Sequence, residues 1–135
     1  MRIFLDTNIL ISAALYPKGK AATAFYRAAG TPNRGIVADY VLDEIRTVFQ
    51  RKFSDKLDLL ESFIAIASMT LETVSTPEES IEAENLIEDV KDRPILRAAT
   101  GANADILITG DDDLLRAAGK IDRPQIMRIA EFLDL

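Results

Sequence analysis

Two aspartates in this 135-residue chain closely follow short apolar runs. Residues 2–5 read Arg-Ile-Phe-Leu before Asp6, and residues 105–109 contain Ile-Leu-Ile before Asp111. An apolar run of this length, closed by a polar turn, is typical of a strand buried on both faces. Parallel strands end at one edge of a sheet, where open α/β sheets bind their ligands. The pattern therefore predicts an acidic site around Asp6 and Asp111.

A third acid comes from a helix expected to run from an N-cap at Asp39 to about Phe53. Its apolar residues form one stripe. At roughly 100° per residue, Asp43 lies almost opposite this stripe, whereas Glu44 lies on its border. We expect Asp43 to be solvated and Glu44 to reach a cleft, although a glutamate at such a border is also common on an ordinary surface.

A fourth acid, Asp92, stands directly before Arg93-Pro94. Asp followed by a proline in the first turn is typical of a helix N-terminus, so Asp92 is either an N-cap, a metal ligand or both. Asp89, three residues earlier, is the reserve candidate.

Three consecutive carboxylates, at Asp111, Asp112 and Asp113, repel one another. Alternation lets Asp111 and Asp113 face one direction while Asp112 faces away. A bound cation explains such a cluster better than a solvated turn does. Ligands that are all oxygen suit Mg²⁺ or Mn²⁺, and one or two such ions can activate a water and stabilise the leaving oxygen in phosphodiester cleavage.

Composition narrows the chemistry further. The chain has no cysteine and no histidine, which excludes disulfides, thiolate or histidine zinc sites, and catalysis by histidine. Its 16 basic and 22 acidic residues give a net charge of −6, which argues against simple electrostatic attraction to nucleic acid. Bound divalent cations would weaken this objection, because they reverse the local field.

Strands and helices are expected to alternate along the chain. The patterns predict strands at 2–5, 35–38, 71–74, 105–109 and 125–127, and helices at 9–15, 21–29, 39–53, 54–67, 76–90, 92–101, 114–118 and from about 128 to Leu135. The helix at 76–90 is inferred from the capping-box sequence Thr76-Pro77-Glu78-Glu79. This alternation predicts one domain over residues 1–135, a three-layer α/β/α sandwich with a central, mainly parallel twisted sheet.

The charge at Asp6 ends the first apolar run far short of a signal peptide, and no segment approaches the length of a membrane span. We therefore expect a soluble, cytoplasmic protein.

Taken together, these motifs resemble the PIN-domain nucleases, in particular the VapC-like toxins of bacterial toxin-antitoxin pairs. The resemblance spans nearly the whole chain. It rests on the order and spacing of Leu5-Asp6-Thr7-Asn8-Ile9-Leu10-Ile11-Ser12, Glu44-Ile45, Asp92 and Thr109-Gly110-Asp111-Asp112-Asp113-Leu114-Leu115. The Arg93-Pro94 stretch departs from relatives, which often carry polar residues there.

The resemblance implies a PIN-like fold and a set of site residues: the catalytic and metal-binding acids Asp6, Glu44, Asp92 and Asp111, a fifth candidate ligand in Asp113, and polar supports in Asn8 and Thr109. It further implies Mg²⁺- or Mn²⁺-dependent endonucleolytic cleavage of RNA, usually leaving a 5′-phosphate. Homodimers or higher homo-oligomers are expected, as is an antitoxin partner where the gene lies in a toxin-antitoxin operon.

Two pairs of basic residues are candidates for contact with RNA phosphates. Lys18 and Lys20 follow the first helix, and Arg93 and Arg97 share one face of the helix that begins at Asp92. Solvated surface charge is the more common role for each residue. Four aromatic residues could pack in the core or at a subunit contact, and none of them is assigned to base stacking: Tyr16, Phe25, Tyr26 and Tyr40.

Two other functions stay open. A haloacid-dehalogenase-like phosphatase also uses a strand-end aspartate, but its acid stands two residues later, where this chain has Asn8. A non-catalytic interaction module would keep the fold without turnover, and the net charge of −6 keeps that alternative in play.

Overall fold

All 135 residues are described in the computed structural model, and five strands form its central sheet. The strands are β1 (Arg2–Leu5), β2 (Arg34–Ala38), β3 (Glu72–Val74), β4 (Ile106–Ile108) and β5 (Gln125–Met127). Their order is β3-β2-β1-β4-β5, and every pairing is parallel. The sequence predicted a mainly parallel sheet, and the structure has an entirely parallel one.

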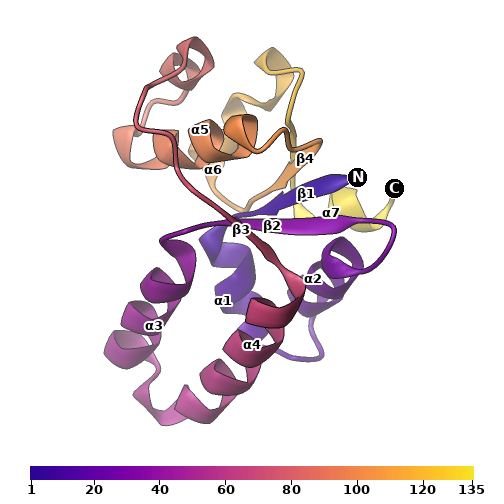
Figure 1. The fold of residues 1–135 in the computed structure, drawn as a ribbon, viewed down its shortest axis with the longest axis vertical. Coiled ribbons are helices and arrows are strands. Elements are labelled where there is room, and N and C mark those ends of the chain that lie inside the picture. Colours follow the sequence, from indigo (N-terminus) through magenta and orange to yellow (C-terminus); the bar gives the residue numbers. More distant parts are fainter.

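Seven α-helices and four short 3₁₀ turns connect these strands. The helices are α1 (Thr7–Leu15), α2 (Lys20–Ala29), α3 (Val41–Lys52), α4 (Leu57–Thr70), α5 (Arg93–Gly101), α6 (Asp112–Arg116) and α7 (Ile129–Leu133). Helices α1 to α4 lie on one side of the sheet, and α5 and α6 lie on the other (Figure 1). This arrangement confirms the predicted three-layer α/β/α fold. None of the helices is both long enough and apolar enough to cross a membrane.

Strand β1 lies at the centre of the sheet and of the core. Ile3, Phe4 and Leu5 are all fully buried, as expected for a parallel strand covered on both faces. From β1 the chain builds outward through β2 to β3, and it then returns to the other side of β1 with β4. The order in which strands are added therefore reverses between β1 and β4, the position at which open α/β sheets bind ligands.

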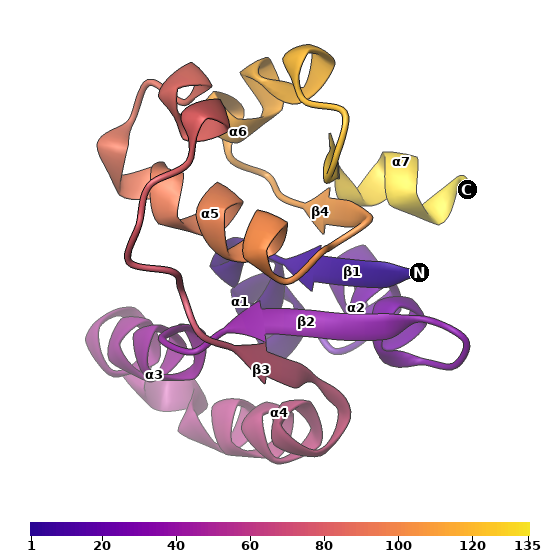
Figure 2. The same cartoon turned by 45° about the horizontal axis from the view of Figure 1, so that its top comes forward.

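The helix expected at residues 76–90 is not formed. Between β3 and α5 the chain makes only two 3₁₀ turns, at Glu82–Leu86 and Val90–Asp92, and it passes α5 near the ends of the strands (Figure 2). The buried side chains of Glu84 and Ile87 hold it in this path. Tertiary contacts therefore override the local capping-box signature.

Asp39 is not the N-cap of α3. That position belongs to Tyr40, which makes no side-chain cap hydrogen bond. The backbone N–H of Asp39 donates to the carbonyl of Val74 at 2.8 Å, and its Oδ1 accepts from the hydroxyl of Thr76 at 3.2 Å. Asp39 thus continues the β2–β3 pairing and its carboxylate is engaged by Thr76, while α3 begins two residues later, at Val41.

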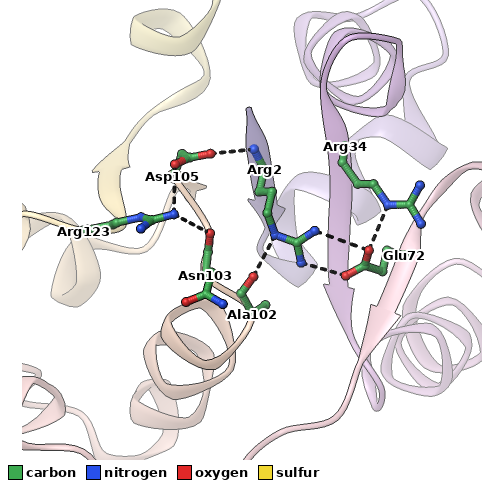
Figure 3. Close-up of polar contacts among 7 residues, drawn as sticks. All are labelled: Arg2, Arg34, Glu72, Ala102, Asn103, Asp105 and Arg123. Atoms are coloured by element: carbon green, nitrogen blue, oxygen red, sulfur yellow. Dashed lines mark hydrogen bonds and ion pairs between the residues drawn. The ribbon is translucent and has the colours of Figure 1, made fainter.

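An ion-pair network ties the strands together at their amino ends (Figure 3). Glu72 on β3 accepts from Arg2 on β1 and from Arg34 on β2, each at 2.8 Å. Asp105, just before β4, accepts from the backbone of Arg2 at 2.8 Å and from Arg123 at 3.2 Å. The arginines, Arg2 first, lower the pKa of Glu72. This network lies at the edge of the sheet opposite the strand-end acids.

Candidate metal-binding and catalytic site

The acids that the sequence singled out converge on one cleft. An open cleft of about 670 Å³ lies at the carboxyl ends of the strands, and Asp6, Glu44, Asp92 and Asp111 all line it. Four separate places supply them: the end of β1, the first turn of α3, and the residues directly before α5 and α6. Only the folded chain brings these four carboxylates together.

Asp6 is the most buried of the four, with 6% of its surface exposed. Its backbone N–H donates to the carbonyl of Ile108 at 3.1 Å, which fixes the end of β1 against β4. Its Oδ1 accepts from the N–H of Thr7 at 2.7 Å and so caps α1, while its Oδ2 accepts from the hydroxyl of Thr109 at 2.7 Å. Burial raises the pKa of Asp6, and these two hydrogen bonds oppose the rise.

Thr109 connects Asp6 to the loop that carries Asp111. Its hydroxyl donates to Asp6 and also accepts the backbone N–H of Asp111 at 3.0 Å. Asp111 in turn caps α6, because its Oδ1 accepts from the N–H groups of Asp113 and Leu114 at 2.9 and 3.2 Å. The predicted supporting residue Thr109 is thus fully buried between two of the acids.

Glu44 lines the cleft, whereas its neighbour Asp43 does not. The side chain of Asp43 is 89% exposed and pairs with Arg46 at 3.6 Å on the outer face of α3. Partial burial and the negative charge of Asp6 raise the pKa of Glu44. The structure therefore separates the two acids in the way that helical phase predicts.

Asp92 occupies the N-cap position of α5, but its side chain makes no cap hydrogen bond. Asp92 therefore does not cap α5 through its side chain, which is the structural role that the sequence left open. Burial raises the pKa of Asp92 to about 6, and the charges of Asp111, Asp89 and Asp6 contribute to the rise. A carboxylate held among other carboxylates without a donor fits a cation better than it fits a cap.

Asp113 and Asp89 are not among the residues that line the cleft. Single carboxylate oxygens of Asp89, Asp92 and Asp113 lie within 4.8 Å of one another, but only Asp92 of these three lines the cleft. Asp113 also pairs with Arg116. The side chain of Asp112 is 77% exposed and that of Asp113 is 20% exposed. Asp113 does not line the cleft with Asp111, as the predicted alternation requires, and lies instead beside Asp89 and Asp92.

Of the four basic residues predicted to contact RNA phosphates, only Arg97 lines the cleft. Lys18 and Lys20 are exposed and do not line the cleft. Arg93 donates from Nε to the carbonyl of Ile87 at 2.9 Å and also lies off the cleft. Arg97 lines the cleft, but its guanidinium is bound within the protein.

Several residues that line the cleft were not among the predicted site residues, Tyr40 and Lys91 among them. Thr7 and the exposed Asn8, from the predicted motif that contains Asp6, line the cleft as well. Burial and the surrounding carboxylates, Glu44 first, raise the pKa of Tyr40, so its phenol stays protonated. Tyr40 lies two residues after the carboxyl end of β2, so the strand-end rule could have found it.

The hydroxyl of Thr7 is the one buried side-chain polar atom without a hydrogen-bond partner. Thr7 is 4% exposed and lines the cleft next to Asp6. Buried polar groups are normally satisfied, and an exception requires an explanation such as a bound ion or water. Together with a donor set made only of oxygens, this orphaned hydroxyl fits a hydrated Mg²⁺ or Mn²⁺ ion.

Comparison with known proteins extends these observations. Among solved structures, a chain of VapBC2 from Rickettsia felis, bound to a DNA fragment from its promoter, is similar with a TM-score of 0.68 and 19% identity; the match covers 95% of this chain and 98% of that one. VapC20 of Mycobacterium tuberculosis, a toxin that cleaves the sarcin-ricin loop, is similar with a TM-score of 0.58 and 17% identity; the match covers 85% of this chain and 94% of that one. At these identities the similarity shows a shared fold. Among curated proteins, none matches.

The family itself is shown by sequence. The model of the PIN domain matches residues 2–113, a range that begins at β1 and includes all four acids that line the cleft. The resemblance seen in the short motifs is thereby confirmed over most of the chain. By its sequence and its fold, this chain belongs to the PIN domain family.

Proposed function

We propose that this PIN-domain chain is a Mg²⁺- or Mn²⁺-dependent endoribonuclease. One observation carries the proposal: four acids from four separate elements line one cleft. Burial and mutual repulsion raise the pKa values of Asp6, Glu44 and Asp92. Such an arrangement is unfavourable unless a cation neutralises it.

Each residue has a distinct part in this proposal. Asp6, Glu44, Asp92 and Asp111 would hold one or two ions, and Thr109 orients Asp6 through its hydrogen bond and favours the ionised form of that carboxyl. Lys91, at the same cleft, provides a positive charge for an RNA phosphate. When bound, the ion supplies Lewis-acid activation of a water and stabilises charge on the phosphate.

The proposal extends to a toxin that acts on RNA in the cytoplasm, forms homodimers or higher homo-oligomers, and is neutralised by an antitoxin protein. The fold shared with VapBC2 and VapC20 and the membership of the PIN domain family support it. Co-expression with a small protein encoded next to this chain tests the antitoxin part. Growth arrest that the neighbour relieves is expected.

Substitutions in the cleft test the nuclease function. Asp6→Asn and Asp92→Asn remove one charge each with little change in shape, and Asp43→Asn is the matched control on the exposed face of α3. With Mn²⁺ and end-labelled RNA, the cleft variants should lose on the order of a hundredfold or more in cleavage rate. The control should retain it. Cleavage that survives equally in both cleft variants would falsify the proposal.

Metal titration separates this function from its alternatives. A non-catalytic module with a degenerate site should show no stabilisation by Mn²⁺, whereas the proposed enzyme is stabilised in proportion to occupancy. The phosphatase alternative requires an aspartyl-phosphate at Asp6, and no structural feature favours it, because Asn8 stands where its acid is needed.

A further inference from the structure

The segment that joins β3 to α5 forms one wall of the acidic cleft. Thr76, Pro77 and Lys91 belong to it and line the cleft, and it ends at Asp92. Apart from two 3₁₀ turns it has no regular secondary structure. Since no continuous helix sets its shape, contacts with the rest of the protein must do so.

The strongest of these contacts is an ion pair between Glu84 on the segment and Arg97 on α5. The two nitrogens Nε and Nη2 of Arg97 each donate to one oxygen of Glu84 at 2.9 Å, and Nη1 donates to the carbonyl of Pro77 at 3.1 Å. The side chains of Glu84 and Arg97 are only 5% and 17% exposed. One guanidinium therefore holds the segment at two points that are seven residues apart in sequence.

Two further contacts hold the same segment at its sides. Thr76 donates its hydroxyl to Asp39 at 3.2 Å, and Arg93 donates to the carbonyl of Ile87 at 2.9 Å. Ile87 is fully buried. The ion pair lies between these two anchors in sequence, where Ile81 and Ala83 also pack against the core, and it is the only ion pair made by that part of the segment.

We propose that Arg97 and Glu84 are a positioning pair, which fixes this wall so that Lys91 and Asp92 face the acids and the RNA across the cleft. This inference rests on the proposed ribonuclease function and specifies how its substrate cleft is built. Arg97 acts through Glu84 and Pro77, and it does not itself bind the RNA. The pairing lowers the pKa of Glu84, which stays ionised at neutral pH.

Glu84→Gln distinguishes the positioning role of Arg97 from direct binding of RNA, because the two roles predict opposite changes in KM. If Arg97 met a phosphate, Glu84→Gln would free the guanidinium and lower KM for RNA. If Arg97 positions the wall, Glu84→Gln loosens it and raises KM. The sign of the change in KM therefore distinguishes the two roles.

The opposite edge of the sheet offers a matched control. Glu72 also pairs with arginines and also has a lowered pKa, but neither it nor its partners line the cleft. Glu72→Gln should lower the melting temperature without moving KM. A general loss of stability is thereby separated from a change at the site.

The experiment measures KM and kcat for labelled RNA, Mn²⁺ affinity, and trypsin cleavage after Lys91, the only basic residue between positions 75 and 92. Glu84→Gln should raise KM roughly tenfold with a smaller change in kcat, because the wall is displaced and not removed. It should weaken Mn²⁺ binding through Asp92 and speed cleavage after Lys91. Arg97→Lys keeps the charge but loses the forked contact, so it should give intermediate values in a chain that still folds.

Two results would overturn the positioning role: an unchanged or lowered KM in Glu84→Gln, or trypsin cleavage and Mn²⁺ affinity that match those of Glu72→Gln. If the wild-type chain does not cleave RNA, the ribonuclease proposal fails, and proteolysis and metal affinity still decide whether the pair holds the wall.

Discussion

The hydroxyl of Thr109 donates a 2.7 Å hydrogen bond to Oδ2 of Asp6, and these two residues directly follow the paired strands β4 and β1. The same hydroxyl accepts the backbone N–H of Asp111 at 3.0 Å. One fully buried oxygen thus sets the positions of the two strand-end acids relative to each other. Because the hydroxyl donates to Asp6, it favours the ionised carboxylate that a cation requires.

Thr109→Val should therefore weaken metal binding without unfolding the chain. Loss of the donated hydrogen bond raises the pKa of Asp6 further, so binding of Mn²⁺ should shift to higher pH and weaken by about tenfold at neutral pH. Titration of Mn²⁺ at several pH values measures both effects. Thr109→Ser, which keeps the hydroxyl, should bind like the wild type, and an unshifted valine variant contradicts this role.

Thr7→Val should stabilise the metal-free protein while weakening its complex with Mn²⁺. The buried hydroxyl of Thr7 has no partner, and a buried unsatisfied group costs about 1–3 kcal/mol. Urea unfolding with and without Mn²⁺ measures the two states. Thr47→Val is the control, since the exposed Thr47 hydroxyl donates to the carbonyl of Asp43 away from the cleft. A loss of stability in metal-free Thr7→Val would show that the hydroxyl is satisfied.

The pKa of Asp92 predicts how the stability of the metal-free protein depends on pH. Folding raises this pKa to about 6, so the folded chain binds a proton more tightly than the unfolded chain. The stability that this proton provides is full below about pH 4 and is lost as pH rises through about 6. Asp92→Asn has no carboxyl group to titrate at this position, so its stability does not show that loss. Relative to the wild type, it should gain on the order of 1–3 kcal/mol between ~pH 4.5 and ~pH 7.5.

Urea unfolding in EDTA at both pH values tests this dependence on pH. Saturating Mn²⁺ should reverse the order at the higher pH, because only the wild type keeps the ligand. Equal stability differences at the two pH values would show that Asp92 has an ordinary pKa.

Ile87→Ala should destabilise the fold by about 2–5 kcal/mol, the usual range for a buried isoleucine. Ile87 is fully buried although it lies outside any helix or strand, whereas its neighbour Leu86 is 42% exposed. Leu86→Ala should therefore change stability little. Similar losses in the two variants, measured by urea unfolding, would contradict the path of the segment between β3 and α5.

The sequence predicts those features that local patterns encode. Apolar runs closed by aspartate locate β1 and β4, and helical phase separates Glu44 from Asp43. Both patterns reflect burial, which periodicity reports directly. Asp6, Glu44 and Asp111 could be named for this reason, whereas Asp92 was named from its place before Arg93-Pro94 and from the resemblance to the PIN-domain nucleases.

Features decided by distant partners could not be predicted in this way. Thr76 has the signature of a helix cap, but its hydroxyl donates to Asp39, 37 residues earlier in the chain. Arg97 was a candidate for RNA contact, yet Glu84 and Pro77 occupy its guanidinium. A local window contains neither partner, so it could predict neither the irregular wall nor the role of the ion pair.

The four acids of the cleft are synthesised at different times. Asp6 and Glu44 come from the first half of the chain, and Asp92 and Asp111 come from the second half. Strand β1 pairs with the early strand β2 on one side and with the late strand β4 on the other. A chain still emerging from the ribosome has the first two acids but lacks the others, and one edge of its β1 is unpaired. The proposed nuclease therefore cannot act during most of its own synthesis, and it gains its site only when the second half of the sheet is added.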